Sequence, residues 1–358
     1  MFRAQVSSVF VTLLIAVAAT ANDAILYFPP GEGDWSTISP ADAQWDADKL
    51  DEALDYAGGV GSTGLVVLLN GRILAERYWT PEDPSARLAN MTVETTPDGR
   101  TIEDVASAQK SVISFLIAIA RDRGVLKLTD RVSNYLEVGW SDTHRDREHE
   151  ITLRHIMSMT SGLKPSLAYE AEPGAFWRYN TNAYAKTVPV LETATGKDIA
   201  TLTREWLTEP IGMRETRWAP RPWVRPNADA NRIGLATSAR DLARFGLLIL
   251  AQGIWDGAAV LENNALLREL LEPSQDLNPA YGLLWWLNGQ ERYLRPGAAG
   301  GEGALIPTAP DDLVAAQGAL GRKCYVVPSR GLVVTRLGDD PGPAFNREFW
   351  RRLMAAAP

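Results

Sequence analysis

Residues 106–124 read ASAQKSVISFLIAIARDRG, and the apolar residues in this stretch recur with the 3.6-residue period of a helix. They cover most of the circumference of the helix, which is typical of a helix in the centre of a core. These residues are Val112, Ile113, Phe115, Leu116, Ala118 and Ile119. Lys110 nevertheless lies in the first turn, where it is either a solvated charge or part of a functional site.

A nucleophile and a base can meet at this position. Residues three apart lie on one face of a helix, so the Ser107 hydroxyl and the Lys110 ammonium can be neighbours. Apolar surroundings disfavour the charged form of a lysine and lower its pKa, so that Lys110 can accept the serine proton near neutral pH. The start of the helix adds unpaired backbone N–H groups where an oxyanion would form. The pattern therefore makes Ser107 a candidate nucleophile, and a solvated lysine in the first turn of a helix is the alternative, because Ser-x-x-Lys alone is a weak pattern.

The same Ser-x-x-Lys spacing occurs again at Ser161 and Lys164. There Pro165 disfavours the helical conformation of Lys164, and Gly162 gives the segment little helical support. The two side chains need not face each other, so we expect Ser161 to have no catalytic role.

Composition restricts the class of partner. The chain has 358 residues, 46% of them hydrophobic and 22% charged, with a net charge of -8 and a pI near 5.1. Nucleic acids and anionic membranes bind basic patches, and none stands out in this acidic chain. The composition therefore disfavours both as partners and favours a small molecule. The single cysteine, Cys324, forbids an internal disulfide and a cysteine zinc cluster.

The first 21 residues have the composition of a secretory signal peptide. One arginine in MFRAQ precedes the apolar run VSSVFVTLLIAVAA, and the small residues ATA at 19–21 suit a cleavage site. The apolar run is short for a membrane span. We therefore expect export to the periplasm or the exterior; retention as a membrane anchor is the alternative.

Strand patterns lie near both ends of the chain and helical patterns lie between them. Residues 45–59 predict a helix, and residues 63–79 predict two strands joined by a tight turn at Asn70-Gly71. Short strand-like runs return beyond residue 280, before a final helix over 345–356. We expect an α/β (α+β) fold whose antiparallel sheet comes from about 45–105 and 240–358, with a mainly helical subdomain inserted over about 106–240.

Five motifs occur in an order that resembles the serine β-lactamase-like hydrolases, a superfamily with class C β-lactamases, penicillin-binding proteins, esterases and 6-aminohexanoate-dimer hydrolases. The resemblance covers roughly residues 45–355 and implies an α/β sandwich with the active site beside a helical subdomain. The motifs are Ser107-Ala108-Gln109-Lys110, LRHIMSMTSGL (153–163), PGAFWRYNTNAYAKTVPVLETATG (173–196), GLATSARDLARFGLLIL (234–250) and QGALGRKCYVVPSRGLVVTRLG (317–338).

The resemblance implies specific catalytic roles. Ser107 matches the acylated nucleophile of the family, and Lys110 matches its base. Tyr179 matches the tyrosine that carries protons to the leaving group and from the deacylating water. The backbone N–H groups of Ser107 and Arg322 would form the oxyanion hole.

Two departures from the family pattern concern substrate binding. Many members have an asparagine where this chain has Thr181, which stands between Asn180 and Asn182. The third motif aligns with Ala319-Leu320-Gly321, where no cation stands at the first position. We expect weaker recognition of a substrate carboxylate, since charge-assisted hydrogen bonds are the stronger ones.

Several aromatic residues are candidates for the wall of an acyl pocket, although core packing is the alternative for each: Trp177, Trp285 and Trp286. The three histidines lack metal-ligand spacing, and no nucleotide-binding loop is present, so we expect neither metal nor cofactor. They are His144, His149 and His155.

These observations together predict a serine hydrolase that acts through an acyl-enzyme on a small carboxylic ester or linear amide. One alternative is an exported binding protein that kept the fold without its chemistry. Another is a cell-wall D,D-peptidase or β-lactamase, membrane-bound only if the N-terminal segment is retained. The sequence leaves the oligomeric state open.

Overall fold

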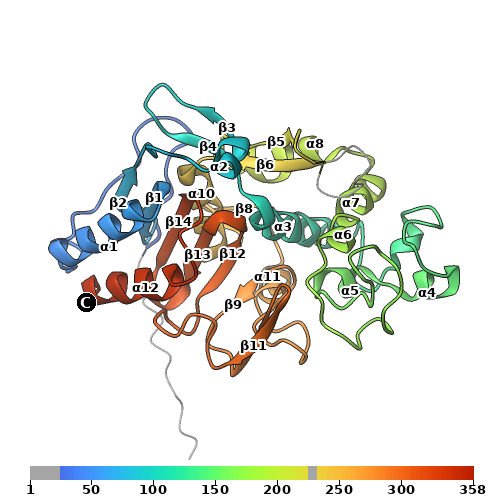
Figure 1. The fold of residues 1–358 in the computed structure, drawn as a ribbon. Coiled ribbons are helices and arrows are strands. Elements are labelled where there is room, and N and C mark those ends of the chain that lie inside the picture. Colours follow the sequence, from blue (N-terminus) through green and yellow to red (C-terminus); the bar gives the residue numbers. More distant parts are fainter. Residues whose placement is uncertain (1–24, 225–231) are drawn as a thin grey trace, which may run out of the picture.

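The computed structural model describes residues 25–224 and 232–358, so the predicted signal peptide at 1–21 lies outside the described residues (Figure 1). Its centre is a six-stranded sheet in the order β2-β1-β14-β13-β12-β9, with every neighbouring pair antiparallel. The first and last parts of the chain meet here because β1 pairs with β14. These strands are β1 (Ser62–Leu69), β2 (Arg72–Tyr78), β9 (Trp286–Leu287), β12 (Val314–Gln317), β13 (Lys323–Val327) and β14 (Leu332–Gly338).

Two hairpins set the register of this sheet. The turn between β1 and β2 has positive φ angles at Asn70 (48°) and Gly71 (85°), which an Asn-Gly pair adopts at little cost. A second turn with Gly331 at φ 58° joins β13 to β14. Both hairpins confirm the sequence prediction, and with them the antiparallel sheet built from both ends of the chain.

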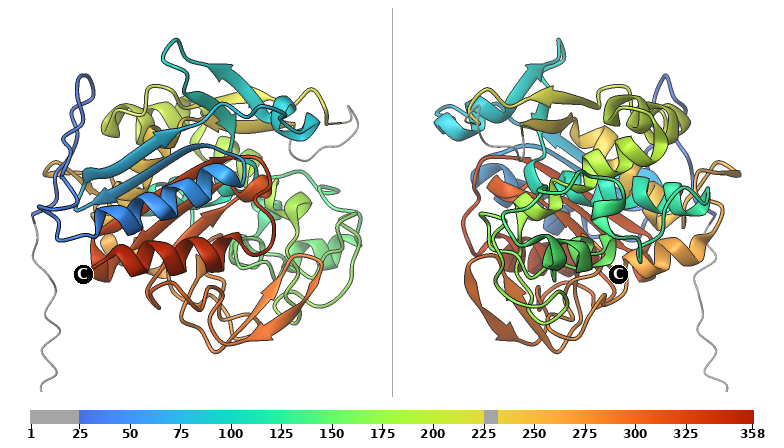
Figure 2. Two further views of the ribbon diagram at one scale, coloured as in Figure 1. Left: turned by 60° about the vertical axis from the view of Figure 1, so that its left-hand side comes forward. Right: turned by 90° about the vertical axis from the view of Figure 1, so that its right-hand side faces the viewer.

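Helices cover both faces of the central sheet. Figure 2 shows α1 (Ala47–Gly59) and α12 (Phe345–Ala356) side by side across one face. On the other face α10 (Ala239–Leu250) contacts β1, β13 and β14. Because both faces are covered, β14 is buried along its whole length and shows no alternation of apolar and polar residues.

The long helix predicted from residue 106 begins with a 3-10 turn at Ala106–Ala108 and continues as α3 (Gln109–Asp122), which is buried from Gln109 to Ala120. The segments after α3 are mostly short helices. They are α4 (Arg145–Glu150), α5 (Leu153–Met157), α6 (Thr181–Tyr184), α7 (Thr187–Thr195), α8 (Ile199–Thr203), a π-helical turn Arg204–Thr208 and α9 (Glu209–Ile211), and later in the chain α11 (Asn264–Leu270).

A second sheet, not predicted from the sequence, has the order β3-β4-β6-β5 and lies next to the start of α3. Its strands are β3 (Thr92–Thr95), β4 (Thr101–Asp104), β5 (Arg217–Pro220) and β6 (Ile233–Thr237). Outside the two sheets lie α2 (Ala86–Met91) and two small hairpins, β7 (Ile254–Trp255) with β8 (Ala258–Ala259) and β10 (Arg292–Arg295) with β11 (Ala298–Glu302). Short 3-10 turns occur at Val132–Asn134, Ala319–Gly321 and Pro328–Arg330.

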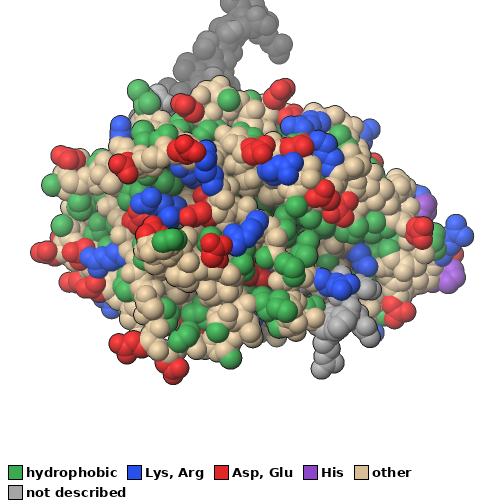
Figure 3. Space-filling view, turned by 90° about the horizontal axis from the view of Figure 1, so that it is seen from above, with side chains coloured by type: hydrophobic (Ala, Val, Ile, Leu, Met, Phe, Trp, Pro, Cys, Tyr) green, Lys and Arg blue, Asp and Glu red, His purple; other side chains and the backbone are tan. Residues whose placement is uncertain are grey.

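The face of the molecule seen in Figure 3 has basic and acidic side chains interspersed, so its charge is dispersed. Within residues 25–224 and 232–358, no helix has the length and apolarity that crossing a membrane requires.

Candidate active site

Ser107 lies at the junction of the second sheet and α3. The backbone turns sharply there: Ala106, directly before the serine, has a φ of 49°, a conformation that costs energy for a residue other than glycine. The Asp104 carboxylate, at the end of β4, accepts a hydrogen bond of 2.8 Å from the Ala106 N–H. This turn places Ser107 in front of the first residues of α3.

Lys110 reaches back to the serine from the first turn of α3. Its Nζ lies 2.9 Å from Ser107 Oγ, and only 2% of the residue is exposed. Among the described residues no carboxylate lies within ion-pair distance of this amine. Burial, together with the positive charge of Arg221, lowers the pKa of Lys110 to about 7. A large fraction of Lys110 is therefore neutral near pH 7 and able to accept a proton.

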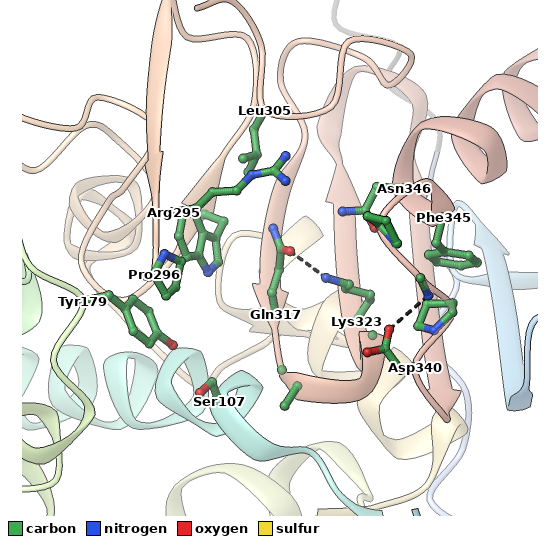
Figure 4. A pocket seen from close by; sticks show the side chains of 17 residues that line it. Ser107, Tyr179, Arg295, Pro296, Leu305, Gln317, Lys323, Asp340, Phe345 and Asn346 are labelled. Atoms are coloured by element: carbon green, nitrogen blue, oxygen red, sulfur yellow. Dashed lines mark hydrogen bonds between the residues drawn. The ribbon is translucent and has the colours of Figure 1, made fainter. Parts of the chain in front are cut away.

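Two tyrosine rings surround the lysine amine. Lys110 Nζ lies 4.5 Å from the centre of the Tyr184 ring and 5.1 Å from that of Tyr179. The Tyr179 ring stacks on Trp286 at 6.0 Å, so it is held in place. Burial raises the pKa of Tyr179 to about 12, and hydrogen bonding with the Ser107 side chain opposes that rise. The phenol thus holds its proton at neutral pH, and its hydroxyl points toward Ser107 (Figure 4).

The end of β12 lies against the serine turn. A Cβ atom on Gly318 would stand 2.1 Å from the Val105 carbonyl oxygen, so only glycine fits at this point. Ala319 follows at once and lines both cavities beside the serine. Among the described residues, neither the Ser107 nor the Ala319 N–H donates a hydrogen bond to the protein. Two amides without a protein acceptor among the described residues therefore belong to residues that line the cavities at the serine.

The structure does not bring the Arg322 amide to this point. The Arg322 N–H is directed at the Ala319 carbonyl oxygen, 3.5 Å away, and the residue lines neither cavity. Its guanidinium is fully buried and lies 2.7 Å from the Glu103 carboxylate. The geometry therefore moves the expected second oxyanion donor from Arg322 to Ala319. The two residues between Ala319 and Arg322 lie in different places. Leu320 is buried with Leu88 and Met91, whereas Gly321 lines one of the two cavities beside Ser107.

Two cavities meet at the serine. The larger, of about 600 Å³, is lined by Tyr179, Trp286 and Lys323 among others. The smaller, of about 470 Å³, is lined by Lys110, Thr181, Arg221 and Trp223 among others. Ser107 and Ala319 line both, so the two halves of a substrate can extend to opposite sides of a bond held at the serine.

The three tryptophans considered for the acyl pocket have different positions. Trp286 lines the larger cavity, and Trp177 packs behind it with ring centres 6.4 Å apart. The expectation that Trp285 walls the pocket is wrong: Trp285 is fully buried and stacks on Phe245 in the core. Successive residues of an extended segment point to opposite sides, so the two adjacent tryptophans cannot both face the cavity.

The polar residues after Tyr179 divide into structural and site-facing groups. The buried Asn180 amide donates to the carbonyl oxygens of Leu163 and Lys164, each at 2.9 Å. Asn182 donates to the Pro165 carbonyl oxygen at 2.6 Å. Both asparagines therefore hold the neighbouring loop, and only Thr181 lines a cavity beside the serine.

Two polar residues that line the cavities, Lys323 and Arg221, are not among the catalytic and substrate-binding residues expected from the sequence. Lys323 on β13 lines the larger cavity with 8% of the residue exposed, and its Nζ donates to Gln317 at 2.6 Å. Burial lowers the pKa of Lys323 to about 7. Arg221 lines the smaller cavity. Its position on a loop far along the chain from Ser107 gave no local motif that could have revealed it.

No group of three or more His, Cys, Asp or Glu side chains that could hold a metal occurs within the described parts of the chain. The residues that surround Ser107 are instead one amine, phenols and backbone amides. This set of groups suits acyl transfer by the protein's own side chains.

Residues 47–358 match the model of the Beta-lactamase family. An uncharacterized protein of Alkalihalophilus pseudofirmus is 21% identical over 82% of this chain and 87% of its own length. The D-alanyl-D-alanine-carboxypeptidase/endopeptidase AmpH of Escherichia coli is 24% identical over 46% of this chain and 47% of its own. A Bacillus anthracis structure described as a 6-aminohexanoate-dimer hydrolase has a TM-score of 0.66 at 18% identity, covering 92% of this chain and 88% of the other. At that identity the likeness concerns the fold.

Proposed function

Because this chain belongs to the Beta-lactamase family, whose members are serine hydrolases, we propose that it hydrolyses small carboxylic esters or linear amides through an acyl-enzyme on Ser107. The observation that carries the proposal is the 2.9 Å separation of Lys110 Nζ and Ser107 Oγ in a buried setting. A nucleophile and a base within hydrogen-bonding distance are the signature of an activated serine.

Acylation begins when neutral Lys110 takes the Ser107 proton and Oγ attacks the substrate carbonyl carbon. The carbonyl oxygen becomes an oxyanion, which the N–H groups of Ser107 and Ala319 stabilise by hydrogen bonds. The Tyr179 phenol then gives its proton to the leaving oxygen or nitrogen, and the Ser107 ester forms as that bond breaks. Lys110 returns its extra proton to Tyr179, which restores both groups for the second half of the reaction.

Deacylation reverses these roles with water as the nucleophile. Lys110 and Tyr179 take a proton from water, whose oxygen attacks the acyl carbon of the ester. The same two amides stabilise the second oxyanion, and collapse of this intermediate returns the proton to Ser107 Oγ. No cofactor is needed in either half.

Small neutral substrates suit the departures from the family pattern. Thr181 and Ala319 line the cavity beside the serine, and neither side chain offers a charged partner for a substrate carboxylate. A backbone oxyanion donor does not depend on those side chains, so the acylation chemistry is retained. A non-catalytic binding protein is less consistent with a serine, lysine and tyrosine held within contact of one another.

A second candidate function is hydrolysis of a peptide with a terminal carboxylate. Lys323 favours it, because its amine lines the larger cavity and could pair with an anion. Arg322 cannot bind the substrate carboxylate, because its guanidinium is fully buried beside Glu103.

The test is covalent labelling of purified protein with a fluorophosphonate, followed by intact mass and peptide mapping. We expect one adduct on Ser107, and Ser107→Ala to abolish both labelling and p-nitrophenyl butyrate hydrolysis. The matched control is Ser161→Ala, which removes a buried serine of the other Ser-x-x-Lys pattern. Equal loss in the two folded variants would contradict the assignment of Ser107.

A further inference from the structure

A buried ion pair lies directly beneath the serine turn. The Asp104 and Arg221 side chains are 3% and 8% exposed, and the pair is bidentate, with contacts of 2.5 Å from Nε and 2.7 Å from Nη2. Gly234 on β6 leaves room for the pair, because a Cβ there would stand 2.2 Å from Asp104 Oδ2 and 2.6 Å from Arg221 Nε. The chain is therefore built around this pair at the point where β4, β6 and the loop after β5 converge.

The carboxylate of this pair also fixes the backbone in front of the nucleophile. Asp104 Oδ1 accepts both the Arg221 bond and the 2.8 Å bond from the Ala106 N–H. Ala106 is the residue with a φ of 49°. A left-handed conformation persists only where surrounding contacts hold it, and the Arg221 fork holds the carboxylate that does so.

The same guanidinium connects to the base. Arg221 Nη2 donates to Gln109 Oε1 at 2.9 Å, and the Gln109 amide lies 3.4 Å from the Tyr184 hydroxyl. The Tyr184 ring in turn lies under the Lys110 amine. Arg221 and Lys110 both line the smaller cavity.

We propose that Arg221 is a positioning residue for the hydrolase reaction: through Asp104 it holds the Ala106 turn that presents Ser107, and it keeps a fixed positive charge beside Lys110. The inference rests on the proposed function, because it requires Lys110 to be the base. The Arg221 guanidinium acts through the hydrogen bonds that it donates to Asp104 and Gln109, not through a bond to the serine, lysine or tyrosine of the site.

The groups that face Lys110 decide the sign of the effect. Ser107 comes from the turn before α3, Tyr179 and Tyr184 come from the region of α6, and Arg221 comes from the loop after β5. Arg221 is the only one of these that carries a charge at neutral pH, and its charge lowers the pKa of Lys110. Removal of that charge, which leaves the Asp104 carboxylate behind, raises the pKa of Lys110 and moves the acid limb of kcat/KM to higher pH.

The experiment compares the pH profiles of kcat/KM for p-nitrophenyl butyrate in wild type, Arg221→Gln and Arg221→Lys. We expect the acid limb of Arg221→Gln to move up by about one pH unit, the size of shift a neighbouring charge produces. Arg221→Lys keeps the positive charge but loses the bidentate contact with Asp104. Its kcat/KM profile should therefore keep the acid limb of wild type, while kcat falls about tenfold because Ser107 is displaced. Thermal unfolding identifies any variant that has not folded.

The matched control is Arg240→Gln, which removes the arginine of another bidentate pair, with Glu76, on α10. It should lower the Tm and leave the acid limb unmoved. The inference is overturned if folded Arg221→Gln has the same acid limb of kcat/KM as wild type, or if Arg221→Lys has the full kcat of wild type. If Arg221→Gln does not fold, the kcat of Arg221→Lys decides alone. Failure of wild type to label at Ser107 would instead refute the proposed function, so the two failures are distinguishable.

Discussion

The pKa of Lys110 makes a quantitative prediction about the pH dependence of catalysis. The reaction requires the neutral amine, and burial with Arg221 nearby lowers the pKa of that amine from 10.5 to about 7. At pH 7.5 an ordinary lysine is neutral in about 0.1% of molecules, whereas Lys110 is neutral in about three quarters of them. The folded environment therefore raises the fraction of active base by roughly 750-fold.

The sign follows from this requirement. Lowering the pH protonates Lys110 and removes activity, so kcat/KM should fall on the acid side with a midpoint near pH 7. The neutral fraction is about 0.9 at pH 8 and about 0.01 at pH 5, which predicts a loss of about 90-fold between these values.

The assay is initial-rate hydrolysis of p-nitrophenyl butyrate from pH 5 to 9, corrected for spontaneous hydrolysis and read at a pH-independent wavelength. Lys110→Arg is the companion variant, because arginine keeps its proton in this range and cannot act as the base. A flat profile between pH 5 and 8, or a Lys110→Arg variant with the activity and acid limb of wild type, would refute Lys110 as the base.

Three further predictions concern proton transfer, substrate class and stability. Tyr179→Phe should lower kcat by about 100-fold or more, as loss of a general acid does, while leaving the Tm nearly unchanged; full activity would mean that the phenol only packs. Nitrocefin should have a lower kcat/KM than p-nitrophenyl butyrate, because Thr181 and Ala319 provide no charged partner for its carboxylate; the reverse order would favour Lys323 as an anion-binding group. Lys323→Met should raise the Tm more at pH 6.5 than at pH 10.5, since the folded-state pKa of about 7 lies below the unfolded value of 10.5 and native stability is lost as pH falls through that window. A Tm gain that does not depend on pH would contradict this last expectation.

The sequence indicated the main features of the fold because those features have local causes. Asn70-Gly71 favours one hairpin turn, and the 3.6-residue period after Lys110 favours a buried helix; both are present. The family resemblance and the α/β class are likewise confirmed by the family match and by the fold. The sheet containing β3, β4, β5 and β6 was not predicted, because its four strands are short and its two halves are joined only by β4 pairing with β6, far away in the chain.

The candidate site was predicted less completely than the fold. Ser107 and Lys110 are three residues apart, so a helical period suffices to bring them together. The second oxyanion amide depends on which glycine approaches the serine turn, and only the three-dimensional packing distinguishes Gly318 from Gly321. Arg221 and Asp104 are separated by 117 positions, and no local pattern marks two residues that pair across a fold.

The pairing of the first strand with the last has a consequence for how this protein folds. Ser62 lies opposite Gly338, so the central sheet cannot be completed until Gly338 has left the ribosome. Contacts between such distant residues give a high contact order, and the entropy of closing so large a loop must be offset before the sheet gains any stability. We therefore expect slow folding after synthesis, and a chain truncated before β14 should remain sensitive to proteases instead of forming a smaller stable core.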